Sequence, residues 1–271
     1  MSEREIAQMF LTLASPSHFV QQLGFEPDSW QMDLMGSETP RIIIACGRQV
    51  GKSTVTGLKA YRKAKMSPGS LTLLISNSYR QSLLLFSKIE DAVRADPDKT
   101  LIEKMNLQEL RLTNGSRIIA APGKGETVRG FSGVDLLVID EAAYVPDALY
   151  SAVSPMVAAS GGQVILLSSP AGKTGFFWNI WDKGKDWERY KVRADECPRI
   201  PQTFLDDEKA TIPDHVYRRE YEAEFTEGLN SLVSYEDLKA SMENDVKSIG
   251  DWSLDPADNR DRLPKVEALS G

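Results

Sequence analysis

The chain has 271 residues, of which 41% are hydrophobic and 26% charged, and its formal net charge is −7. This length suffices for one or two domains with a sizeable buried core, and the composition is that of an ordinary water-soluble globular protein. The acidic excess argues against a surface that is basic overall and wraps nucleic acid, although it leaves room for a local basic channel.

Neither the N-terminus nor the hydropathy pattern indicates an exported or membrane-spanning protein. The first residues, Met1-Ser-Glu-Arg-Glu, lack the basic and then apolar order of a signal peptide. No stretch approaches the about 20 apolar residues that cross a bilayer. The two cysteines, Cys46 and Cys197, are too few for a disulfide framework, so we expect free thiols in a reducing compartment.

The chain is expected to begin with an amphipathic helix over Glu3–Leu13, and Trp30 and Gln31 follow further along. An aromatic ring can stack on adenine, and a glutamine amide offers both a donor and an acceptor to the base edge. Trp30 and Gln31 are therefore candidate adenine contacts. The alternative is the start of a helix, with Trp30 in the core and Gln31 on the surface.

The next stretch, Arg41–Ser53, carries the strongest functional motif. Its apolar run Ile42–Ala45 predicts a strand buried on both faces, since no polar residue alternates within it. A glycine-containing turn, Cys46–Gly51, follows, and Lys52 opens a helix. Strand, turn, Gly-Lys-Ser and helix, in this order, are typical of a phosphate-binding loop.

The residue types of this loop fit the chemistry of a polyphosphate. Backbone N–H groups of the turn and of the helix N-terminus converge on one spot, and Gly51 admits the phosphates without a Cβ in the way. Lys52 would reach the β- and γ-phosphates, and the Ser53 hydroxyl would hold Mg²⁺. The general pattern has a glycine six residues before the lysine, where this chain has Cys46. The candidate nucleotide contacts in and around the loop are Trp30, Gln31, Gly47, Arg48, Gln49, Val50, Gly51, Lys52, Ser53 and Thr54.

The stretch between this loop and the next strong motif predicts a strand, a helix and a hairpin. The apolar run 71–76 is a second candidate buried strand, and Asn77 or Ser78 can cap the helix that follows. An Asn-Gly pair between apolar runs predicts a β-hairpin within 110–121. A glycine-rich loop then leads to Arg129.

The stretch 134–141, Val-Asp-Leu-Leu-Val-Ile-Asp-Glu, predicts a third buried strand that ends at Asp140. In a parallel sheet the carboxyl ends of the strands meet on one side, where ligands bind. Asp140 would therefore lie beside Ser53 and hold Mg²⁺, and Glu141 would orient and deprotonate the attacking water. The alternative is that both carboxylates only cap the next helix. A carboxylate base favours hydrolysis over a switch that only binds nucleotide.

A fourth strand is expected over 163–168, and it ends at Ser168 and Ser169. Small hydroxyls beside the γ-phosphate can sense whether that phosphate is present. The Ser-Ser-Pro sequence is also a common turn, which is the simpler interpretation of these residues alone.

A further strand (188–193) and two helices (204–211 and 214–225) complete the expected fold. Beyond Gly228 the pattern weakens, with a short helix over 235–243 as the last expected element. The polar tail holds three aspartates that no apolar strand fixes, so we expect a solvated linker rather than a metal cluster; they are Asp255, Asp258 and Asp261.

Buried strands, a phosphate loop and carboxylates at a strand end together predict a doubly wound α/β nucleoside triphosphatase with a mostly parallel sheet. Nothing in the sequence resembles the Asn-Lys-x-Asp signature for guanine. We therefore expect ATP and Mg²⁺ as the ligands.

In the order of these elements the chain resembles the ATPase domain of the terminase large subunit, the motor that packages DNA in tailed bacteriophages. The resemblance covers about residues 20–228. Terminases often lack the first glycine of the loop, which is Cys46 here. The segments that carry the resemblance are Trp30-Gln31, Arg48–Ser53, Val128-Arg129-Gly130, Val138–Ala143, Ser168-Ser169-Pro170 and the helix 217–225.

This resemblance implies roles for several residues. Gln31 falls where the family contacts adenine, and Ser168 and Ser169 fall where it couples hydrolysis to movement. Arg48 and Arg129 are both candidate arginine fingers, and we favour Arg129 acting on a neighbouring subunit. The alternatives are that Arg48 bridges to an acidic residue of a lid and that Arg129 pins its own loop.

The resemblance also implies an organisation and partners. The fold would be a P-loop NTPase of the additional-strand, catalytic-glutamate type. Residues 1–180 would form the ATPase core, 181–228 a small lid subdomain, and 229–271 a linker towards a nuclease domain that this chain does not reach. No nuclease activity is then expected of the chain. Double-stranded DNA, the capsid portal, a small terminase subunit and sister subunits in a ring would be the partners, in the host cell cytoplasm and without a membrane.

Two other classes of function stay open. A helicase-like DNA-dependent ATPase would share the loop and the Asp-Glu pair, and strand displacement on a forked substrate would distinguish it. A nucleotide-dependent scaffold that does not hydrolyse ATP is the third possibility, against which Glu141 argues.

Overall fold

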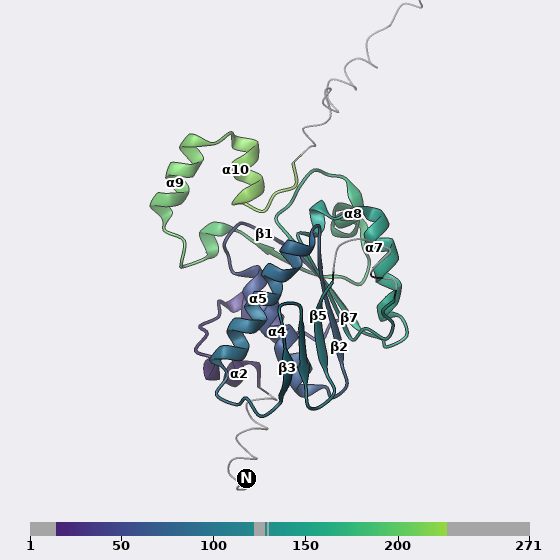
Figure 1. Ribbon diagram of the computed structural model, residues 1–271. Helices are drawn as coiled ribbons and strands as arrows, with labels where there is room; N and C mark the ends of the chain where they lie inside the picture. Colours follow the sequence, from purple (N-terminus) through teal and green to yellow (C-terminus); the bar gives the residue numbers. More distant parts are fainter. Residues whose placement is uncertain (1–14, 122–127, 129, 227–271) are drawn as a thin grey trace, which may run out of the picture. The chain divides into compact units, whose positions relative to one another are not determined.

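A computed structural model describes residues 15–121, 128 and 130–226, all within the unit Met1–Gly228. These residues form one eight-stranded sheet in the order β3-β4-β5-β2-β6-β7-β1-β8, with helices on both faces (Figure 1). The helices expected over 3–13 and 235–243 and the three tail aspartates lie outside the described residues.

Most of the sheet is parallel, as predicted. The parallel strands are β1 (Arg41–Cys46), β2 (Leu71–Ser76), β5 (Arg117–Ala120), β6 (Leu136–Asp140), β7 (Gln163–Ser168) and β8 (Glu188–Val192). The interiors of β1, β6 and β7 are uninterrupted apolar runs, and that of β2 is apolar except for the buried Thr72, because both faces of these strands are covered.

The strand order has one consequence for function. β7 lies between β1, which leads into the phosphate loop, and β6, which ends at Asp140. This is the additional strand of the predicted class of P-loop NTPase. It brings the end of β7, at Ser168, between the loop and the Asp-Glu pair.

An antiparallel extension closes one edge of the sheet. The predicted hairpin is present as β4 (Glu109–Leu112) and β5, with Gly115 of its turn at φ 84. β3 (Ile102–Met105) pairs antiparallel with β4 and was not anticipated. It is a mostly exposed edge strand, so its sequence lacks the apolar pattern that marks the central strands.

The helices divide between the two faces of the sheet. The buried residues of α2 (Pro16–Gln22), α3 (Ser29–Gly36), α4 (Lys52–Met66) and α5 (Tyr79–Ala95) belong to one apolar cluster. Those of α7 (Asp147–Val153) and α8 (Gly175–Lys183) belong to the other. Short 3-10 turns follow β6 (Ala142–Tyr144), α7 (Ser154–Val157) and β8 (Ala194–Glu196). Ser78 caps α5 by accepting from the Gln81 N–H, as predicted.

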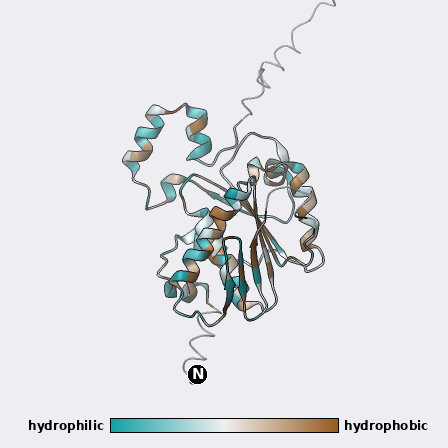
Figure 2. Ribbon diagram, in the orientation of Figure 1, coloured by the Kyte–Doolittle hydropathy of each residue, from teal (hydrophilic) through white to brown (hydrophobic). Residues whose placement is uncertain are grey.

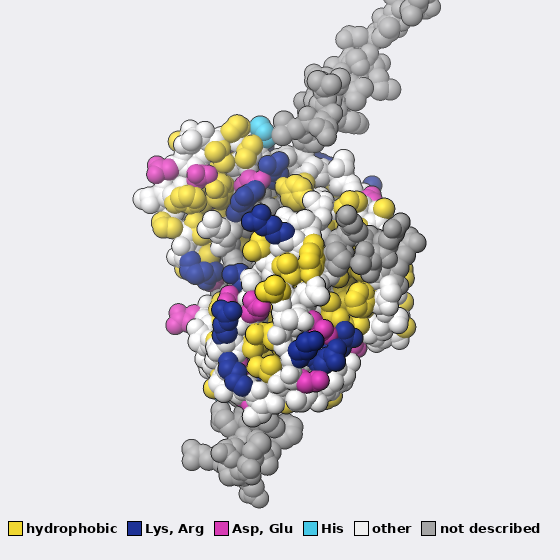
Figure 3. All heavy atoms as spheres, in the orientation of Figure 1, with side chains coloured by type: hydrophobic (Ala, Val, Ile, Leu, Met, Phe, Trp, Pro, Cys, Tyr) yellow, Lys and Arg dark blue, Asp and Glu magenta, His cyan; other side chains and the backbone are white. Residues whose placement is uncertain are grey.

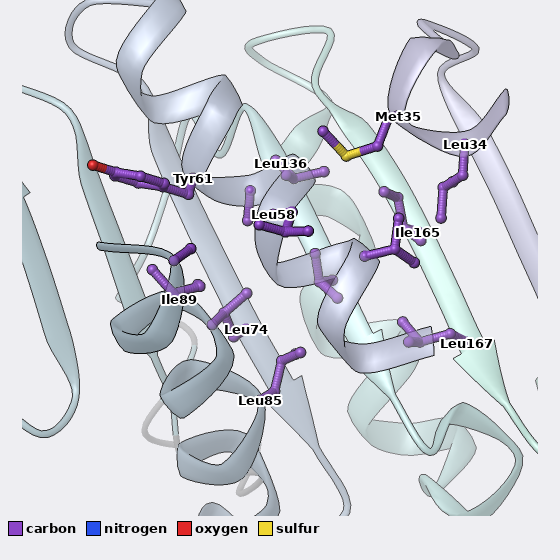
Figure 4. Close-up of a cluster of buried hydrophobic side chains, with 14 of the residues drawn as sticks. Leu34, Met35, Leu58, Tyr61, Leu74, Leu85, Ile89, Leu136, Ile165 and Leu167 are labelled. Carbon is purple, nitrogen blue, oxygen red and sulfur yellow. The ribbon is translucent and has the colours of Figure 1, made fainter. Parts of the chain in front are cut away.

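Alternate residues of each central strand enter the two clusters, as the period of a β-strand requires. Leu74 of β2 and Ile165 of β7 belong to the cluster under α4 and α5, together with Leu58 (Figure 4). The neighbouring Leu73 faces the opposite cluster. Figure 2 shows the result as hydrophobic strands between amphipathic helices. Burying one such leucine contributes about 1.5–3 kcal/mol, so the core holds the strand ends in fixed register.

Two helices follow β8, and the second differs from expectation. α9 (Gln202–Thr211) extends the expected helix by two residues at its start, and α10 (Asp214–Glu220) ends five residues before the predicted boundary at 225. Ala223 has φ 53, a left-handed conformation that a continuing α-helix cannot contain. The division at residues 180 and 181 into core and lid stays a prediction.

Charged side chains do not form a uniformly basic surface on the face in Figure 3, where Lys and Arg lie among Asp, Glu and apolar groups. Both cysteines are buried free thiols, as predicted. Within the described part of the chain, no helix has the length and apolar character needed to cross a bilayer.

Candidate active site

The candidate site lies at the carboxyl ends of the central strands β1, β6 and β7. The loop after β1 is shaped by two glycines. Gly51, with φ 87, precedes α4, and a Cβ there would lie 2.6 Å from the Gln31 amide nitrogen. A Cβ on Gly47 would lie 2.9 Å from the Tyr221 carbonyl oxygen. Gly47 therefore needs glycine because the backbone of another segment approaches it closely, and Gly51 needs it because a side chain would be strained at its positive φ.

Two polar pairs connect this loop to the end of β6. The Ser53 hydroxyl donates to the Asp140 carboxylate at 3.1 Å. The Lys52 ammonium forms an ion pair with the Glu141 carboxylate, also at 3.1 Å. The four residues that the sequence assigned to phosphate, metal and water are thus brought together.

Glu141 is held in an unusual backbone conformation. Its φ of 50 and ψ of 41 place it in the left-handed region, where a residue with a side chain costs about 1–3 kcal/mol. Its N–H donates to the Asp140 carboxylate at 2.9 Å. Its side chain makes no helix-capping hydrogen bond and turns towards Lys52 instead. The alternative in which Glu141 only caps the next helix is therefore wrong.

Ser168 joins this arrangement from the end of β7. Its side chain is fully buried, and its hydroxyl donates to the Glu141 carboxylate at 3.3 Å. Ser169 is 3% exposed, and its hydroxyl has no hydrogen-bond partner within the described residues. The simpler interpretation, in which Ser168 is only part of a turn, therefore does not account for its contact with Glu141.

Burial and charge shift the pKa values of these groups. Desolvation raises the pKa of Asp140 to about 6, although Lys52 opposes the shift. Burial lowers the pKa of Lys52, but nearby negative groups, Glu141 and Asp140 among them, outweigh this and raise it to about 12. Desolvation also raises the pKa of the Cys46 thiol to about 12, so this cysteine is a neutral, inert wall of the site.

Oxygen ligands suit Mg²⁺, which retains several waters and needs only one or two carboxylates besides substrate phosphates. Ser53 and Asp140 supply a hydroxyl and a carboxylate in contact with each other. The buried Asp140 carboxylate, whose pKa is raised, is a group that a cation would stabilise in its charged form. In the described part of the chain no group of three or more His, Cys, Asp or Glu offers a richer metal site. The residues therefore fit a Mg²⁺ ion at this pair.

Arg48 of the loop contacts the segment that ends α10. Its guanidinium donates to the Glu220 carboxylate at 2.5 Å, and its backbone N–H donates to the Glu220 carbonyl at 2.7 Å. Arg219 also donates to this carboxylate, at 2.8 Å. Burial alone would raise the pKa of Glu220, but the two arginines lower it below its usual value. Arg48 therefore forms an ion pair with an acidic residue, Glu220, as the alternative to an arginine finger proposed.

Gln31 is fully buried, so the alternative that placed it on the surface is wrong. Its amide nitrogen donates to the Val50 carbonyl of the loop at 3.1 Å, and its amide oxygen accepts from the Asp28 N–H at 2.9 Å. Trp30 is half-buried against the core. In this arrangement Gln31 fixes the loop to the start of α3, and an adenine contact stays a prediction.

Arg199, for which the sequence predicted no role, also contacts the phosphate loop and the start of α3. Its guanidinium grips both oxygens of the Asp28 carboxylate, at 2.8 and 2.7 Å, and also donates to the Val50 carbonyl at 3.3 Å. The Val50 carbonyl thus accepts from Gln31 and from Arg199. Three segments far apart in the sequence meet at one peptide group of the phosphate loop.

The remaining candidates are less constrained. Gln49 is exposed, with φ 61, and Thr54 lies half-buried in the first turn of α4. Arg129 lies outside the described residues, so its roles stay predictions. The neighbouring Val128 is buried in the core.

Comparison with known proteins gives a consistent family. A sequence model described as "Terminase large subunit, T4likevirus-type, N-terminal" matches residues 43–240. The terminase large subunit of Thermus phage G20c is 26% identical over 258 residues, covering 81% of this chain and 53% of that protein. The terminase large subunit of Escherichia phage T5 is 25% identical over 242 residues, covering 82% and 55% respectively. The chain thus spans about half the length of the curated relatives it matches.

Solved structures share the fold. The large terminase ATPase domain of Thermus phage P74-26 aligns with a TM-score of 0.67 at 23% identity, covering 77% of this chain and 97% of that one. The large terminase of another thermophilic bacteriophage, solved in complex with ADP, aligns with a TM-score of 0.61 at 11% identity, covering 74% and 54%.

Proposed function

Because the chain belongs to the T4-like-virus type of terminase large subunits, matched in their N-terminal part, we propose that it is a Mg²⁺-dependent ATPase that drives double-stranded DNA into a viral capsid. The observation that carries the proposal is the meeting of Lys52 and Ser53 with Asp140 and Glu141 at one edge of the sheet. A phosphate-binding cation, a hydroxyl, a carboxylate for metal and a carboxylate base are the parts that phosphoryl transfer to water requires.

Nucleotide binding follows from the loop. Backbone N–H groups at the start of α4 and the Lys52 ammonium would neutralise the β- and γ-phosphates. Lys52 is 13% exposed and already paired with Glu141, so its charge is positioned before substrate arrives. A γ-phosphate that binds Lys52 would compete for this ion pair and release Glu141 towards the attacking water.

Hydrolysis then needs a base and a metal site. Glu141 would accept a proton from water as its oxygen attacks the γ-phosphorus, while the bond from that phosphorus to the β–γ bridging oxygen breaks and ADP departs. Ser53 and Asp140 would hold Mg²⁺, which neutralises charge on the phosphate oxygens when bound. Ser168 would orient the Glu141 carboxylate through its hydroxyl.

The proposal also assigns residues to adenine recognition and to the arginine finger. Trp30 and Gln31 would contact adenine, and the Gln31 amide would report base binding to the loop through Val50. Arg48 is tied to Glu220 within its own chain, which supports a role for Arg48 in linking the loop to the lid. We therefore assign the finger to Arg129 of a neighbouring subunit.

The wider assignments rest on the relatives, which are whole terminase large subunits. Duplex DNA, the capsid portal, a small terminase subunit and sister subunits in a ring are the partners that we propose, in the host cell cytoplasm. Residues 1–180 would be the ATPase core, 181–228 the lid and 229–271 a linker. We propose no nuclease activity for this chain.

The proposal is tested by the ATPase rate with Mg²⁺, with and without blunt duplex DNA, over a range of protein concentrations. We expect phosphate release that rises with duplex DNA and faster than linearly with protein concentration. No release under any of these conditions would overturn the proposal. Strand separation on a forked substrate, without preference for blunt duplex, would replace it with a helicase-like ATPase.

A further inference from the structure

A cavity of about 220 Å³ lies between α4 and the segment that enters β1, at the edge of the sheet opposite the phosphate loop. It is lined by Glu38 before β1, by Gln163 at the start of β7, and by Lys59, Arg62 and Lys63 of α4. One water needs only about 10–15 Å³, so the space can hold a polyatomic ligand with its waters.

The charge of the lining is unbalanced. Two lysines, Lys59 and Lys63, line the cavity together with one carboxylate, Glu38. Lys59 and Lys63 are four residues apart on α4, where like charges repel each other. Among the described residues neither lysine has an ion pair, whereas Lys65 of the same helix contacts Asp96 at 2.6 Å.

Lys59 is built into the wall. It is 5% exposed, and its ammonium donates to the Ser37 carbonyl at 2.5 Å. An ammonium has three N–H donors, and this is the one hydrogen bond that Lys59 makes within the described part of the chain. Desolvation lowers the pKa of Lys59 to about 8; Arg62 and Lys63 add to this effect, while Glu38 and Glu188 oppose it.

The dipole of α4 does not account for this arrangement. Cations are stabilised in the last turn of a helix, which explains Lys63 and Lys65. Lys59 lies about two turns before the end of α4, beyond the reach of that effect. A buried, incompletely hydrogen-bonded cation facing a polar cavity needs another reason.

We propose that this cavity binds a phosphate group, with Lys59 and Lys63 as its principal donors. A phosphate anion offsets the excess of the two lysines over Glu38, and the buried Lys59 ammonium has N–H donors left for charge-assisted hydrogen bonds, which are stronger than neutral ones. The phosphate group belongs either to a free phosphate or to a nucleic-acid backbone. The site lies away from Lys52 and does not depend on the proposed ATPase.

Calorimetric titration with inorganic phosphate at pH 7 tests the site. The parent is the Lys52→Ala protein, so that the phosphate loop contributes little. We expect saturable binding that Lys59→Met weakens by about tenfold or more, the equivalent of one charge-assisted hydrogen bond. Lys183→Met is the matched control, since that lysine is 81% exposed and should leave binding unchanged.

Two further variants guard against a folding defect in Lys59→Met. Lys63→Met, at a half-buried position, should also weaken binding, and Glu38→Gln should strengthen it because the opposing charge is lost. The affinity should fall as pH rises past about 8, where Lys59 loses its proton. No binding, or equal affinity in the parent and all three cavity variants, would overturn the proposal.

A blunt DNA duplex added to the phosphate-loaded parent distinguishes the sources. Displacement of phosphate from the parent by a duplex whose own affinity falls in Lys59→Met identifies a nucleic-acid backbone, and undiminished phosphate binding in saturating duplex identifies a free anion. Displacement by duplex that persists in every cavity variant would show that phosphate binds elsewhere and would overturn the assignment.

Discussion

The Ser168 hydroxyl lies 3.3 Å from the Glu141 carboxylate, so the end of β7 contacts the residue that we propose as the general base. The contact follows from sheet register, because β7 pairs in parallel with β6 and places Leu167 opposite Asp140. Ser168 is buried, so its hydroxyl has few alternatives to this carboxylate. A change in the position of Glu141 during hydrolysis would therefore reach β7 directly.

Ser168→Ala should lower kcat roughly three- to tenfold, the value of one long hydrogen bond to a charged group, with little change in KM. Steady-state ATPase kinetics measure both constants. Ser87→Ala, at a partly exposed serine on α5, is the control, and an unchanged kcat in Ser168→Ala would separate Ser168 from Glu141.

Asp28 and Arg199 should be coupled in stability and in nucleotide affinity. A double-mutant cycle of Asp28→Ala and Arg199→Ala should give a coupling of about 0.5–1 kcal/mol, since half of the Arg199 side chain is exposed. KM for ATP should rise in both single variants because the Val50 peptide group loses a partner. Urea unfolding and ATPase kinetics provide the measurements.

The pair Arg193 and Asp195 is a matched control for that cycle. It has the same two-pronged geometry, at 2.9 Å for both hydrogen bonds, but it joins residues two positions apart. The variants of the Arg193 and Asp195 cycle should leave KM for ATP unchanged, because this side-chain pair makes no hydrogen bond to the phosphate loop within the described part of the chain. Equal effects of the two cycles on KM would show that Arg199 does not support the phosphate loop.

Burial of the Asp140 carboxylate should cost stability in the absence of metal. Its folded pKa of about 6 exceeds the ordinary 3.8, so the native state holds the extra proton between these values and stability falls as pH rises through that window. The two-unit difference corresponds to at most about 3 kcal/mol at pH 7. Asp140→Asn should therefore raise the free energy of unfolding in metal-free buffer at pH 7, while abolishing ATPase activity.

Urea denaturation at pH 4, 5, 6 and 7 with EDTA checks this expectation. The difference between Asp140→Asn and the parent should grow from pH 4 to pH 6 and then level off. A constant difference across this range would mean that Asp140 titrates normally in the folded protein.

The sequence predicted the structure best where a pattern of residue types fits only one kind of local structure. The apolar runs predicted β1, β2, β6 and β7, because a strand covered on both faces has a largely apolar sequence. The Gly-Lys-Ser motif and the Asp-Glu pair were predicted to lie beside each other, because each follows a strand of the same parallel sheet, and the structure brings them into contact. β3 escaped prediction because Glu103 and Lys104 of this exposed edge strand carry no burial signal.

The contacts that the sequence did not reveal join distant residues without a motif. Arg199 and Asp28 are 171 positions apart, and neither neighbourhood marks the partner. Gln31 was misjudged in the surface alternative because a polar side chain is usually exposed, whereas here the Val50 carbonyl and the Asp28 N–H satisfy its amide. Glu220 was foreseen only as some acidic residue of a lid, since helical spacing alone cannot choose among several carboxylates.

Mixing two inactive variants tests who supplies the arginine finger. If Arg129 acts on a neighbouring subunit, Arg129→Ala and Glu141→Gln proteins should together recover part of the ATPase activity, because a site with its own glutamate can use the other variant's arginine. A finger contributes about 10³–10⁵ in rate, so even partial recovery is measurable. No recovery in mixtures that co-assemble by light scattering would transfer the role to Arg48.

The most direct test of the account compares Glu141→Gln with Lys52→Ala in Mg-ATP binding and single-turnover hydrolysis. Glu141→Gln keeps the polar volume but loses the base, so we predict binding within a few-fold of the parent and hydrolysis slower by about 10²-fold or more. Lys52→Ala should weaken binding itself, and Glu103→Gln, an exposed carboxylate on β3, should change neither. Near-normal single-turnover hydrolysis by Glu141→Gln would contradict the account.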